Sequence, residues 1–262
     1  MNKIATYSLF LSLFIILLWG IYISYEYYSP PRIKEVYNIP RNGGDTLNIA
    51  FIGDSWAFLH PFHNCLIAKS LEDSLHIPVA VYSYGINGHT SKEIYEELYK
   101  DSELRFFMFE RKYEYCFISV GINDTYKKMS ISYYTKSIEG IISLLIANQI
   151  HPIILEIPDY DIQRAYQRQN FIKKPLRILS MFVSRTPIDC KQQFRDAFEK
   201  LAEKKYMSKD ISILRYSSWN NNYTRDLSNL YRPDGMHLNN NGYQKIDSII
   251  AQIIIECEKK KQ

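Results

Sequence analysis

Two short stretches near opposite ends of the chain carry the residue types of a nucleophilic catalyst. Ser55 closes a Gly-Asp-Ser sequence, and His237 stands three residues after Asp234. A serine hydroxyl is a weak nucleophile at neutral pH and needs an adjacent base. Histidine suits that role because it changes charge near neutrality, and a carboxylate on its other ring nitrogen can fix its tautomer. The sequence therefore predicts a catalytic triad of Ser55, His237 and Asp234.

Two further stretches offer hydrogen-bond donors for the oxyanion that forms when a nucleophile attacks a carbonyl carbon. Gly88 lies in the sequence Ile-Asn-Gly-His-Thr, and Asn123 lies in Gly-Ile-Asn-Asp. A glycine lets the backbone approach closely, and an asparagine amide is a donor. Each such donor typically lowers the barrier by roughly 3–4 kcal/mol. We expect an oxyanion hole formed by the Ser55 N–H, the Gly88 N–H and the Asn123 side chain.

Short apolar runs alternate along the chain with longer segments of helical periodicity, which is typical of an α/β fold. Five runs are predicted to be strands: Leu47–Ile52, Val79–Tyr84, Tyr115–Val120, Pro152–Ile157 and Ile211–Tyr216. Four segments are predicted to be helical: Trp56–Leu75, Ser91–Tyr99, Ser132–Asn148 and Gly242–Glu258. Continuous apolar strands separated by helices indicate a parallel sheet that is covered on both faces.

The candidate residues follow the ends of these strands. Ligands of such sheets bind beyond the carboxyl ends of the strands. Ser55 follows the first predicted strand, the Gly88 stretch follows the second, and the Asn123 stretch follows the third. Because these strand ends meet at one edge of the sheet, we expect the three residues to lie close together.

The four stretches resemble, in the right order, the characteristic blocks of the SGNH (GDSL) hydrolase family. Ser55 matches the nucleophile block, Gly88 and Asn123 match the two oxyanion blocks, and the Asp234–His237 stretch matches the Asp-x-x-His block. The resemblance covers the chain from about Leu47 to Ile255. It implies a flavodoxin-like three-layer α/β/α fold, in agreement with the predicted strands. It also implies ester hydrolysis by a serine nucleophile without a metal or an organic cofactor.

Two positions depart from the usual pattern of this family. Trp56, Ala57 and Phe58 follow the serine where a small or leucine-containing stretch is common, and His89 stands where an aspartate is common. Neither position carries a catalytic role in the family, but both could reshape the acyl pocket. We expect His89 to line the mouth of the substrate site.

The candidate residues also have structural interpretations. A serine after a strand is a favoured helix N-cap, and a histidine before the last helix could serve as a capping or surface residue. Asp54 and Asp124 are expected to be structural, bonding backbone groups near their turns. The joint presence of a nucleophile, a base, a carboxylate and two oxyanion donors favours catalysis for Ser55 and His237.

The sequence predicts no metal centre. His60 and His63 could both touch a metal, but no carboxylate or cysteine cluster accompanies them, and we expect them at the surface or at a pocket edge. Cys-x-x-Cys pairs, which mark many zinc and redox sites, are absent among Cys65, Cys116, Cys190 and Cys257. The even number permits disulfides outside the cell without predicting them. Cys116 lies in an apolar run and is expected in the core.

The first 28 residues are predicted to be a transmembrane signal-anchor. Ile4–Ile23 is almost entirely apolar, and roughly 20 helical residues span the hydrocarbon core of a bilayer. An aromatic belt follows, made of Trp19, Tyr22, Tyr25, Tyr27 and Tyr28. The alternative is a cleaved signal peptide, which would have a shorter apolar region and an Ala-x-Ala-like site. Residues 29–45, rich in proline and glycine, are the predicted linker, and residues 46–262 are the predicted hydrolase domain.

The charges that flank the apolar segment argue in both directions about the membrane orientation. Lys3 and the terminal amine favour an N-terminus on the inside, whereas Arg32, Lys34 and Arg41 argue weakly for the reverse. A first apolar segment usually acts as a signal-anchor, so we expect a single-pass membrane protein with an extracytoplasmic domain.

The overall charge excludes one class of partner. The formal net charge is +4, from 32 basic and 28 acidic residues, which is too balanced to imply nucleic-acid binding. The stretch Arg164–Lys191 is locally basic. We expect it to be a solvated helical face, although a lid or rim that attracts an anionic glycan or the membrane surface is the alternative. No pattern indicates an oligomeric state.

Together these features predict a membrane-anchored serine esterase. The expected partner is an acylated glycan or a small ester, and the expected substrate group is an O-acetyl ester of a cell-envelope polysaccharide. Three alternatives remain open: a polysaccharide O-acyltransferase with the same triad, a lipid esterase, and a non-catalytic glycan-binding module.

Overall fold

The computed structural model describes residues 3–29, 31, 46–61, 66–168, 173–184, 186–206, 210–220 and 222–261. The predicted linker at residues 29–45 lies almost wholly outside these ranges, and so do His63 and Cys65. The side chains of Tyr27 and Tyr28 are likewise not described. The three cysteines within the described ranges, Cys116, Cys190 and Cys257, are free thiols.

Five strands form one parallel sheet, as the sequence predicts. They are β1 (Leu47–Gly53), β2 (Val79–Gly85), β3 (Tyr115–Ser119), β4 (His151–Leu155) and β5 (Ser212–Leu214). Their order in the sheet is β2-β1-β3-β4-β5, and β1 pairs in parallel with both β2 and β3. The chain therefore moves from β1 to one side and later returns to the other. This reversal places the expected ligand crevice at the carboxyl ends of β1 and β3.

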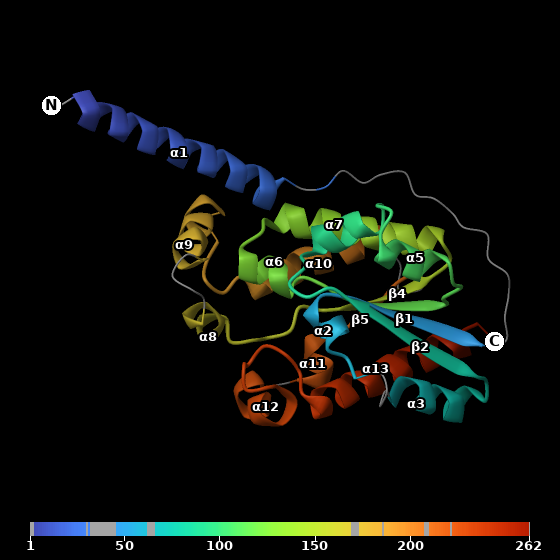
Figure 1. Ribbon diagram of the computed structural model, residues 1–262. Helices are drawn as coiled ribbons and strands as arrows, with labels where there is room; N and C mark the ends of the chain where they lie inside the picture. The colour runs from blue at the N-terminus through green and yellow to red at the C-terminus, as the bar shows by residue number, and fades with distance from the viewer. Residues whose placement is uncertain are drawn as a thin grey trace.

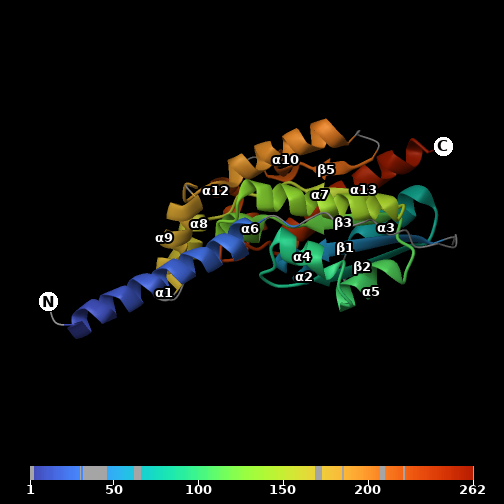
Figure 2. The same ribbon diagram turned by 90° about the horizontal axis from the view of Figure 1, so that it is seen from above.

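Alternate side chains of the strands belong to two hydrophobic cores. In β1, Ala50 and Ile52 enter one core, whereas Ile49 and Phe51 enter the other. The first core is covered by α4 (Ser91–Glu97), α5 (Glu103–Phe109), α7 (Ile131–Ala147) and α10 (Lys191–Lys205). The second is covered by α3 (Leu66–Leu75), α11 (Tyr216–Trp219), α12 (Tyr223–Leu230) and α13 (Asn240–Lys259). Figures 1 and 2 show helices on both sides of the sheet, which confirms the predicted three-layer α/β/α fold.

The last helix, α13, follows directly from its sequence pattern. Asn239 caps it, because the Asn239 side chain accepts a hydrogen bond from the Gly242 N–H at 3.0 Å. Ile246, Ile250 and Ile254 recur at helical spacing and are buried against the sheet. Burying each such side chain contributes roughly 1.5–3 kcal/mol. Since α13 starts just after the candidate histidine, its packing also fixes where that histidine lies.

The prediction of one helix over residues 56–75 is wrong. The first piece, α2 (Ser55–Phe58), ends at Leu59, and α3 begins only at Leu66. Pro61 explains the break, because a proline disfavours helical backbone at the residue before it, here His60. The helix that begins at the serine is therefore a single turn, and the chain turns away from the site immediately after it.

Several shorter helices have no counterpart among the predicted elements. Besides α5, α10, α11 and α12, one of these is α6 (Ile122–Lys127). Helices α8 (Ile162–Gln167) and α9 (Lys173–Ser184) occupy much of the basic stretch Arg164–Lys191, which was expected to be helical without bounds for its individual helices. Figure 1 shows α8 and α9 at the end of the molecule where α2 and α6 follow the strands.

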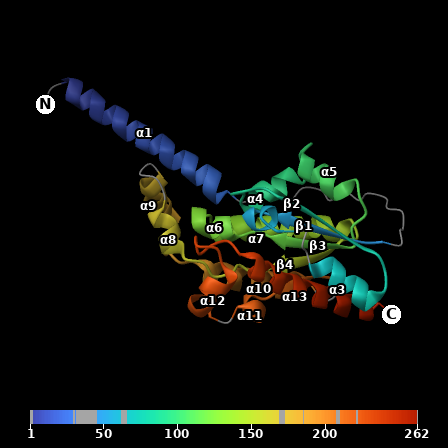
Figure 3. The same cartoon turned by 60° about the horizontal axis from the view of Figure 1, so that its bottom comes forward.

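The N-terminal helix α1 (Lys3–Tyr28) projects from the domain (Figures 1 and 3). Its segment Lys3–Tyr25 is long and apolar enough to cross a membrane, and nearly all of its side chains are exposed. The same length and composition fit a signal sequence. The helix contacts α7 and α9, and Ile23 near its C-terminal end is buried.

Candidate active site

Ser55 lies at a tight strand-to-helix turn at the carboxyl end of β1. Gly53 has φ +147°, and a Cβ there would lie 2.0 Å from the Ser119 carbonyl oxygen, so only glycine fits. Asp54 caps α2 by accepting a hydrogen bond from the Trp56 N–H at 3.0 Å. Ser55 is therefore the first helical residue rather than the N-cap, and its side chain is left free for other contacts.

The side chains of the predicted triad form a continuous chain of hydrogen bonds. His237 Nε2 lies 2.9 Å from Ser55 Oγ, and His237 Nδ1 lies 2.7 Å from Asp234 Oδ2. The other carboxylate oxygen of Asp234 accepts the backbone N–H groups of Met236 and His237 at 2.8 and 2.9 Å. This arrangement holds the imidazole ring between the hydroxyl and the carboxylate, as a general base requires.

The loop that carries Asp234 and His237 is fixed by its own backbone. Tyr231 and Leu238 form an antiparallel bridge across it, and the Arg232 N–H donates to the His237 carbonyl oxygen at 2.7 Å. The Arg232 side chain also donates from Nε to the Leu238 carbonyl oxygen at 3.0 Å. These bonds close the loop on itself, so the three-residue spacing of the aspartate and histidine becomes a rigid pair.

The environment keeps Asp234 ionised. Partial burial raises the pKa of this carboxyl, but the hydrogen bonds from the backbone and ring of His237 and from the Met236 N–H outweigh it. The net pKa lies below its usual value. A carboxylate that stays charged at mildly acidic pH can stabilise the imidazolium that forms when the histidine accepts a proton.

Neither the Ser55 N–H nor the Gly88 N–H has a protein acceptor among the described residues. Gly88 lies in the loop between β2 and α4 with φ +75°, a conformation that favours glycine. Both residues line the same cavity as His237. Their N–H groups are therefore candidate donors to an oxyanion in this cavity.

Asn123 is nearly buried at the start of α6, and its amide is already engaged. Its Nδ2 donates to the His89 carbonyl oxygen at 3.0 Å and to Asp54 Oδ2 at 3.3 Å. The second of these bonds is long for an N–H···O contact. The side chain lines the cavity. Because its bond to Asp54 is the longer of the two, this N–H is the one that could donate to a bound oxyanion instead.

Two fully buried aspartates support this part of the site. Asp54 accepts from the Trp56 N–H, from Ser119 Oγ at 3.3 Å and from Asn123, and burial raises its pKa to about 7. Asp124 accepts from the Ser91 N–H at 2.9 Å and from Ser91 Oγ at 2.5 Å. Burial raises the pKa of Asp124 to about 6. Asp54 thus joins β1, β3 and α6, while Asp124 joins α6 to α4, which is a wider structural role than a turn residue.

A cavity of about 370 Å³ opens onto these groups. The residues that line it are Ser55, Asn87, Gly88, Asn123, Tyr126, Ala165, Arg168, Asp234, Met236 and His237. Sequence reasoning missed Tyr126, Ala165 and Arg168, because α6 and α8 were not predicted as elements. His89, next to Gly88, is not among the lining residues, and its carbonyl oxygen accepts a hydrogen bond from Asn123.

His60 is a buried structural residue rather than a surface or pocket-edge residue. Its Nε2 lies 2.8 Å from Asp247 Oδ1 on α13, and both side chains are fully enclosed. The ring packs against Phe51 and Tyr243, at centroid distances of 4.5 and 5.2 Å. Among the described residues, no group of three potential ligands surrounds a metal position. His60 and Asp247 are 187 residues apart in the sequence, so only the folded structure reveals that they pair.

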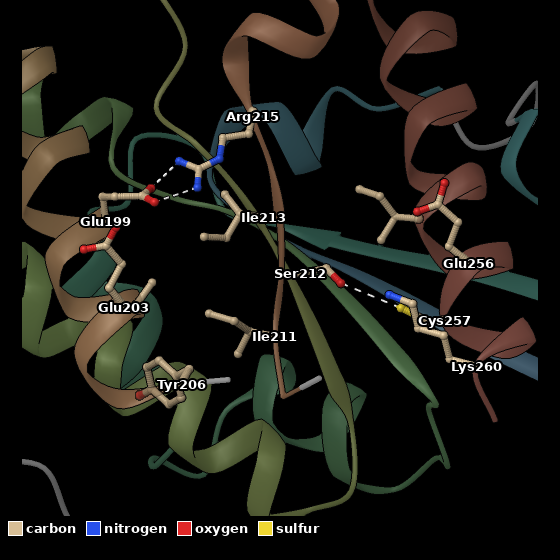
Figure 4. A pocket seen from close by; sticks show the side chains of 12 residues that line it. Glu199, Glu203, Tyr206, Ile211, Ser212, Ile213, Arg215, Glu256, Cys257 and Lys260 are labelled. Atoms are coloured by element: carbon tan, nitrogen blue, oxygen red, sulfur yellow. Dashed lines mark hydrogen bonds and ion pairs between the residues drawn. The ribbon is translucent and has the colours of Figure 1, made fainter. Parts of the chain in front are cut away.

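A second serine–histidine contact occurs beside another cavity, of about 390 Å³, between α10, β5 and α13 (Figure 4). Ser212 Oγ lies 2.9 Å from His151 Nε2, and Cys257 Sγ lies 3.8 Å from Ser212 Oγ. Within the described ranges, His151 has no carboxylate within ion-pair distance. Burial lowers the pKa of His151. This contact lacks the orienting carboxylate that the Ser55 site has, so it does not form a comparable relay.

Comparison with known proteins finds similar solved structures but no matching sequence family. No protein-family model matches the chain, and no curated protein matches it. Among solved structures, a lipase/acylhydrolase from Enterococcus faecalis is similar, with TM-score 0.56, 16% identity, and 80% of this chain and 96% of that chain covered.

Two further structures agree with this likeness. A candidate SGNH hydrolase from Slackia heliotrinireducens has TM-score 0.51, 14% identity and coverage of 80% and 99%. An acetyl-xylooligosaccharide esterase from Geobacillus has TM-score 0.50, 15% identity and coverage of 79% and 94%. At these identities the likeness concerns the fold. The chain therefore has the three-layer α/β/α fold of the SGNH/GDSL hydrolases.

Proposed function

We propose that this protein is a membrane-anchored serine esterase that hydrolyses acyl esters, with Ser55 as nucleophile, His237 as base and Asp234 as the carboxylate that orients the histidine. The observation that carries the proposal is the pair of hydrogen bonds at 2.9 and 2.7 Å that links the three side chains. A fold that supports many functions does not by itself argue for catalysis, whereas this geometry does.

The first half of the reaction forms an acyl-enzyme. His237 Nε2 accepts the proton of Ser55 Oγ while the oxygen attacks the carbonyl carbon of the ester. The carbonyl oxygen becomes an oxyanion, which accepts hydrogen bonds from the Ser55 N–H, the Gly88 N–H and Asn123. When the intermediate collapses, the carbon–oxygen bond to the alcohol breaks, and His237 gives its proton to that alcohol.

The second half returns the enzyme to its starting state. A water molecule loses a proton to His237 as it attacks the acyl carbon, and the same donors hold the second oxyanion. Collapse breaks the bond to Ser55 Oγ, which regains a proton from His237 while the acid leaves. Asp234 stays ionised in both halves and stabilises the imidazolium each time it forms.

We propose O-acetyl groups on a cell-envelope polysaccharide as the substrate. The cavity that holds Ser55 is small, and Ala165 and Met236 provide its apolar lining. The similar esterase from Geobacillus acts on acetylated xylooligosaccharides, which is a precedent for sugar-borne acetyl groups on this fold. Anchoring by α1 would keep such an enzyme beside the polysaccharide that it trims.

The test is hydrolysis of p-nitrophenyl acetate, butyrate and octanoate by the full chain in detergent micelles. Ser55→Ala should lower kcat by roughly 10⁴-fold or more, because the nucleophile is removed. Ser248→Ala is the matched control, since that exposed hydroxyl only bonds the Gln244 carbonyl oxygen. Wild-type turnover in folded Ser55→Ala protein would refute the assignment. Preference for octanoate over acetate would shift the substrate from acetyl groups to lipids.

A further inference from the structure

Helix α9 presents its apolar side chains outward, which is the reverse of an ordinary surface helix. Phe182 is 82% exposed and Ile178 is 69% exposed, whereas Ser180 on the same helix is buried. Val183 and, just beyond the helix, Ile188 are also exposed. A helix that only covered the domain would turn its apolar residues inward. An exposed apolar patch of this kind marks an interaction surface.

The polar side of α9 is attached to the domain. The Arg177 guanidinium lies 4.9 Å from the ring centroid of Tyr126, within cation–π distance. The chain beyond α9 is held by the buried Lys128, whose ammonium group donates to the Pro187 carbonyl oxygen at 3.0 Å and to that of Ile188. Because Arg177 within the helix and the chain just beyond it are both held by the domain, the outward face of α9 is a stable feature.

The outward face of α9 continues the surface of α1. The two helices contact each other, and Figures 1, 2 and 3 all place α9 beside the C-terminal half of α1. If α1 spans a bilayer, this half lies where the span reaches the lipid–water interface. Lys174 is exposed on the same helix and supplies a cation at the level of lipid headgroups. An interfacial helix has this combination of apolar and basic residues.

We propose that α9 lies in the lipid–water interface beside α1, so that the bilayer is the partner that covers Ile178, Phe182 and Val183. The proposal rests on the membrane anchoring stated under the proposed function. It gives the basic stretch Arg164–Lys191 a role that a solvated helical face does not explain, because solvation leaves Phe182 without a reason to be exposed.

This placement also sets the position of the active site. Tyr126, which Arg177 covers, lines the Ser55 cavity, and it stacks on Tyr166 of α8 at a centroid distance of 5.4 Å. Arg168, at the end of α8, lines the same cavity. An α9 fixed in the interface therefore holds the mouth of the cavity close to the membrane surface. Substrates that are attached to, or extend from, that surface would reach Ser55 most readily.

The test uses the full chain in nanodiscs of phosphatidylethanolamine and phosphatidylglycerol. The photoreactive residue p-benzoylphenylalanine replaces Phe182 in one variant, Phe10 of α1 in a second and Phe106 of α5 in a third. Phe106 is the matched control, because it is 47% exposed and belongs to α5, which lies at the opposite end of the domain from α9 in Figures 1 and 3. After irradiation, mass spectrometry measures the yield of lipid adducts and of crosslinked chains.

We expect lipid adducts at positions 10 and 182 and a background yield at position 106. Adducts at position 10 alone would overturn the α9 proposal while leaving the anchor intact. No adduct at either position would overturn the anchor and the α9 proposal together. Crosslinked dimers at position 182 in place of lipid adducts would assign this face to a second copy of the chain. In every variant, hydrolysis of p-nitrophenyl acetate reports separately on the esterase proposal and on folding.

Discussion

At the scale of single residues, the amide of Asn123 is the proposed side-chain donor to the oxyanion. Its two hydrogens point to the His89 carbonyl oxygen and, at a longer distance, to Asp54. Asn123→Ala should lower kcat for p-nitrophenyl acetate by about 10²–10³-fold, because the donor acts mainly on the developing charge of the transition state. KM should change little for the same reason. Steady-state kinetics on the full chain measures both constants.

The matched control for this variant is Asn241→Ala. Asn241 is exposed at the start of α13, and its side chain bonds only Asn229. It should retain the kcat of the parent protein. A loss of activity in Asn123→Ala that appeared entirely in KM would contradict the oxyanion role and would favour ground-state binding of the substrate.

Asp54 should give the protein a characteristic dependence of stability on pH. Burial raises its pKa from the ordinary 3.8 to about 7, and hydrogen bonds from Trp56, Ser119 and Asn123 only partly oppose this. Between these values the folded protein holds a proton that the unfolded chain releases. The free energy of unfolding should therefore decrease as the pH rises from about 4 to about 7.

Urea denaturation of the full chain in micelles at a series of pH values measures this slope. Asp54→Asn should flatten this pH dependence, because the titrating group is gone. Asp124, whose pKa is raised to about 6, should still contribute part of the slope. Asp73→Asn is the control at an exposed carboxyl on α3, and it should keep the parent slope over this range. Equal slopes for Asp54→Asn and the parent would show that Asp54 is ionised throughout.

The sequence predicts most of the candidate site because its members follow strand ends or share one tight loop. Ser55, Gly88 and Asn123 each come directly after a buried strand, so a parallel sheet brings them to one edge. His237 and Asp234 need only three residues of chain to meet. No comparable pattern places Arg168 in the cavity, because its position there depends on the path of α8 in the folded chain.

At the scale of elements, the contact between α2 and β2 fixes the position of Ser55, the proposed nucleophile. A Cβ at Gly85 would lie 1.9 Å from the Phe58 backbone nitrogen, so the last turn of α2 sits directly on the end of β2. Gly85→Ala must push α2 away, which should cost about 1–3 kcal/mol of stability. Because Ser55 begins the same helix, kcat should fall as well.

Thermal unfolding and p-nitrophenyl acetate hydrolysis together test this contact. Gly20→Ala in α1 is the control, since nothing lies within 4 Å of the added methyl group there. A Gly85→Ala protein with parent stability and parent kcat would mean that α2 can shift without moving the serine.

Element prediction succeeded where periodicity was strong and failed where helices were short or interrupted. The stripe Ile246, Ile250 and Ile254 marks α13 because three turns of one face are buried together. The break after α2 depends on Pro61, which disfavours helical backbone at His60. This local effect could have been recognised in the sequence, but the helical periodicity of residues 66–75 suggested one continuous helix. The stretch Arg164–Lys191 was expected to be helical, but the bounds of α9 and its exposed apolar side chains were not predicted, because an apolar face that points outward does not report burial by the domain.

At the scale of the whole molecule, the proposed anchor, α9 and the cavity lie toward one end. Figure 1 shows α9 and α8 beside the end of the sheet where α2 and α6 begin, with α1 above them. The opposite end carries α5 and the amino ends of the strands. The proposed chemistry and the proposed membrane contact therefore share one face, which the photocrosslinking yields at positions 10, 106 and 182 examine directly.

The sequence separation between the proposed nucleophile and the proposed base affects when the site can form during synthesis. Ser55 and His237 are 182 residues apart, and the loop that carries the histidine is held by α13, close to the last residues that the structure describes. At a synthesis rate of roughly 5–20 residues per second, the serine is made about 9–36 s before the histidine. A nascent chain that has already engaged a membrane through α1 would thus carry an inert hydroxyl. Hydrolysis could begin only after almost all of the domain had been translated.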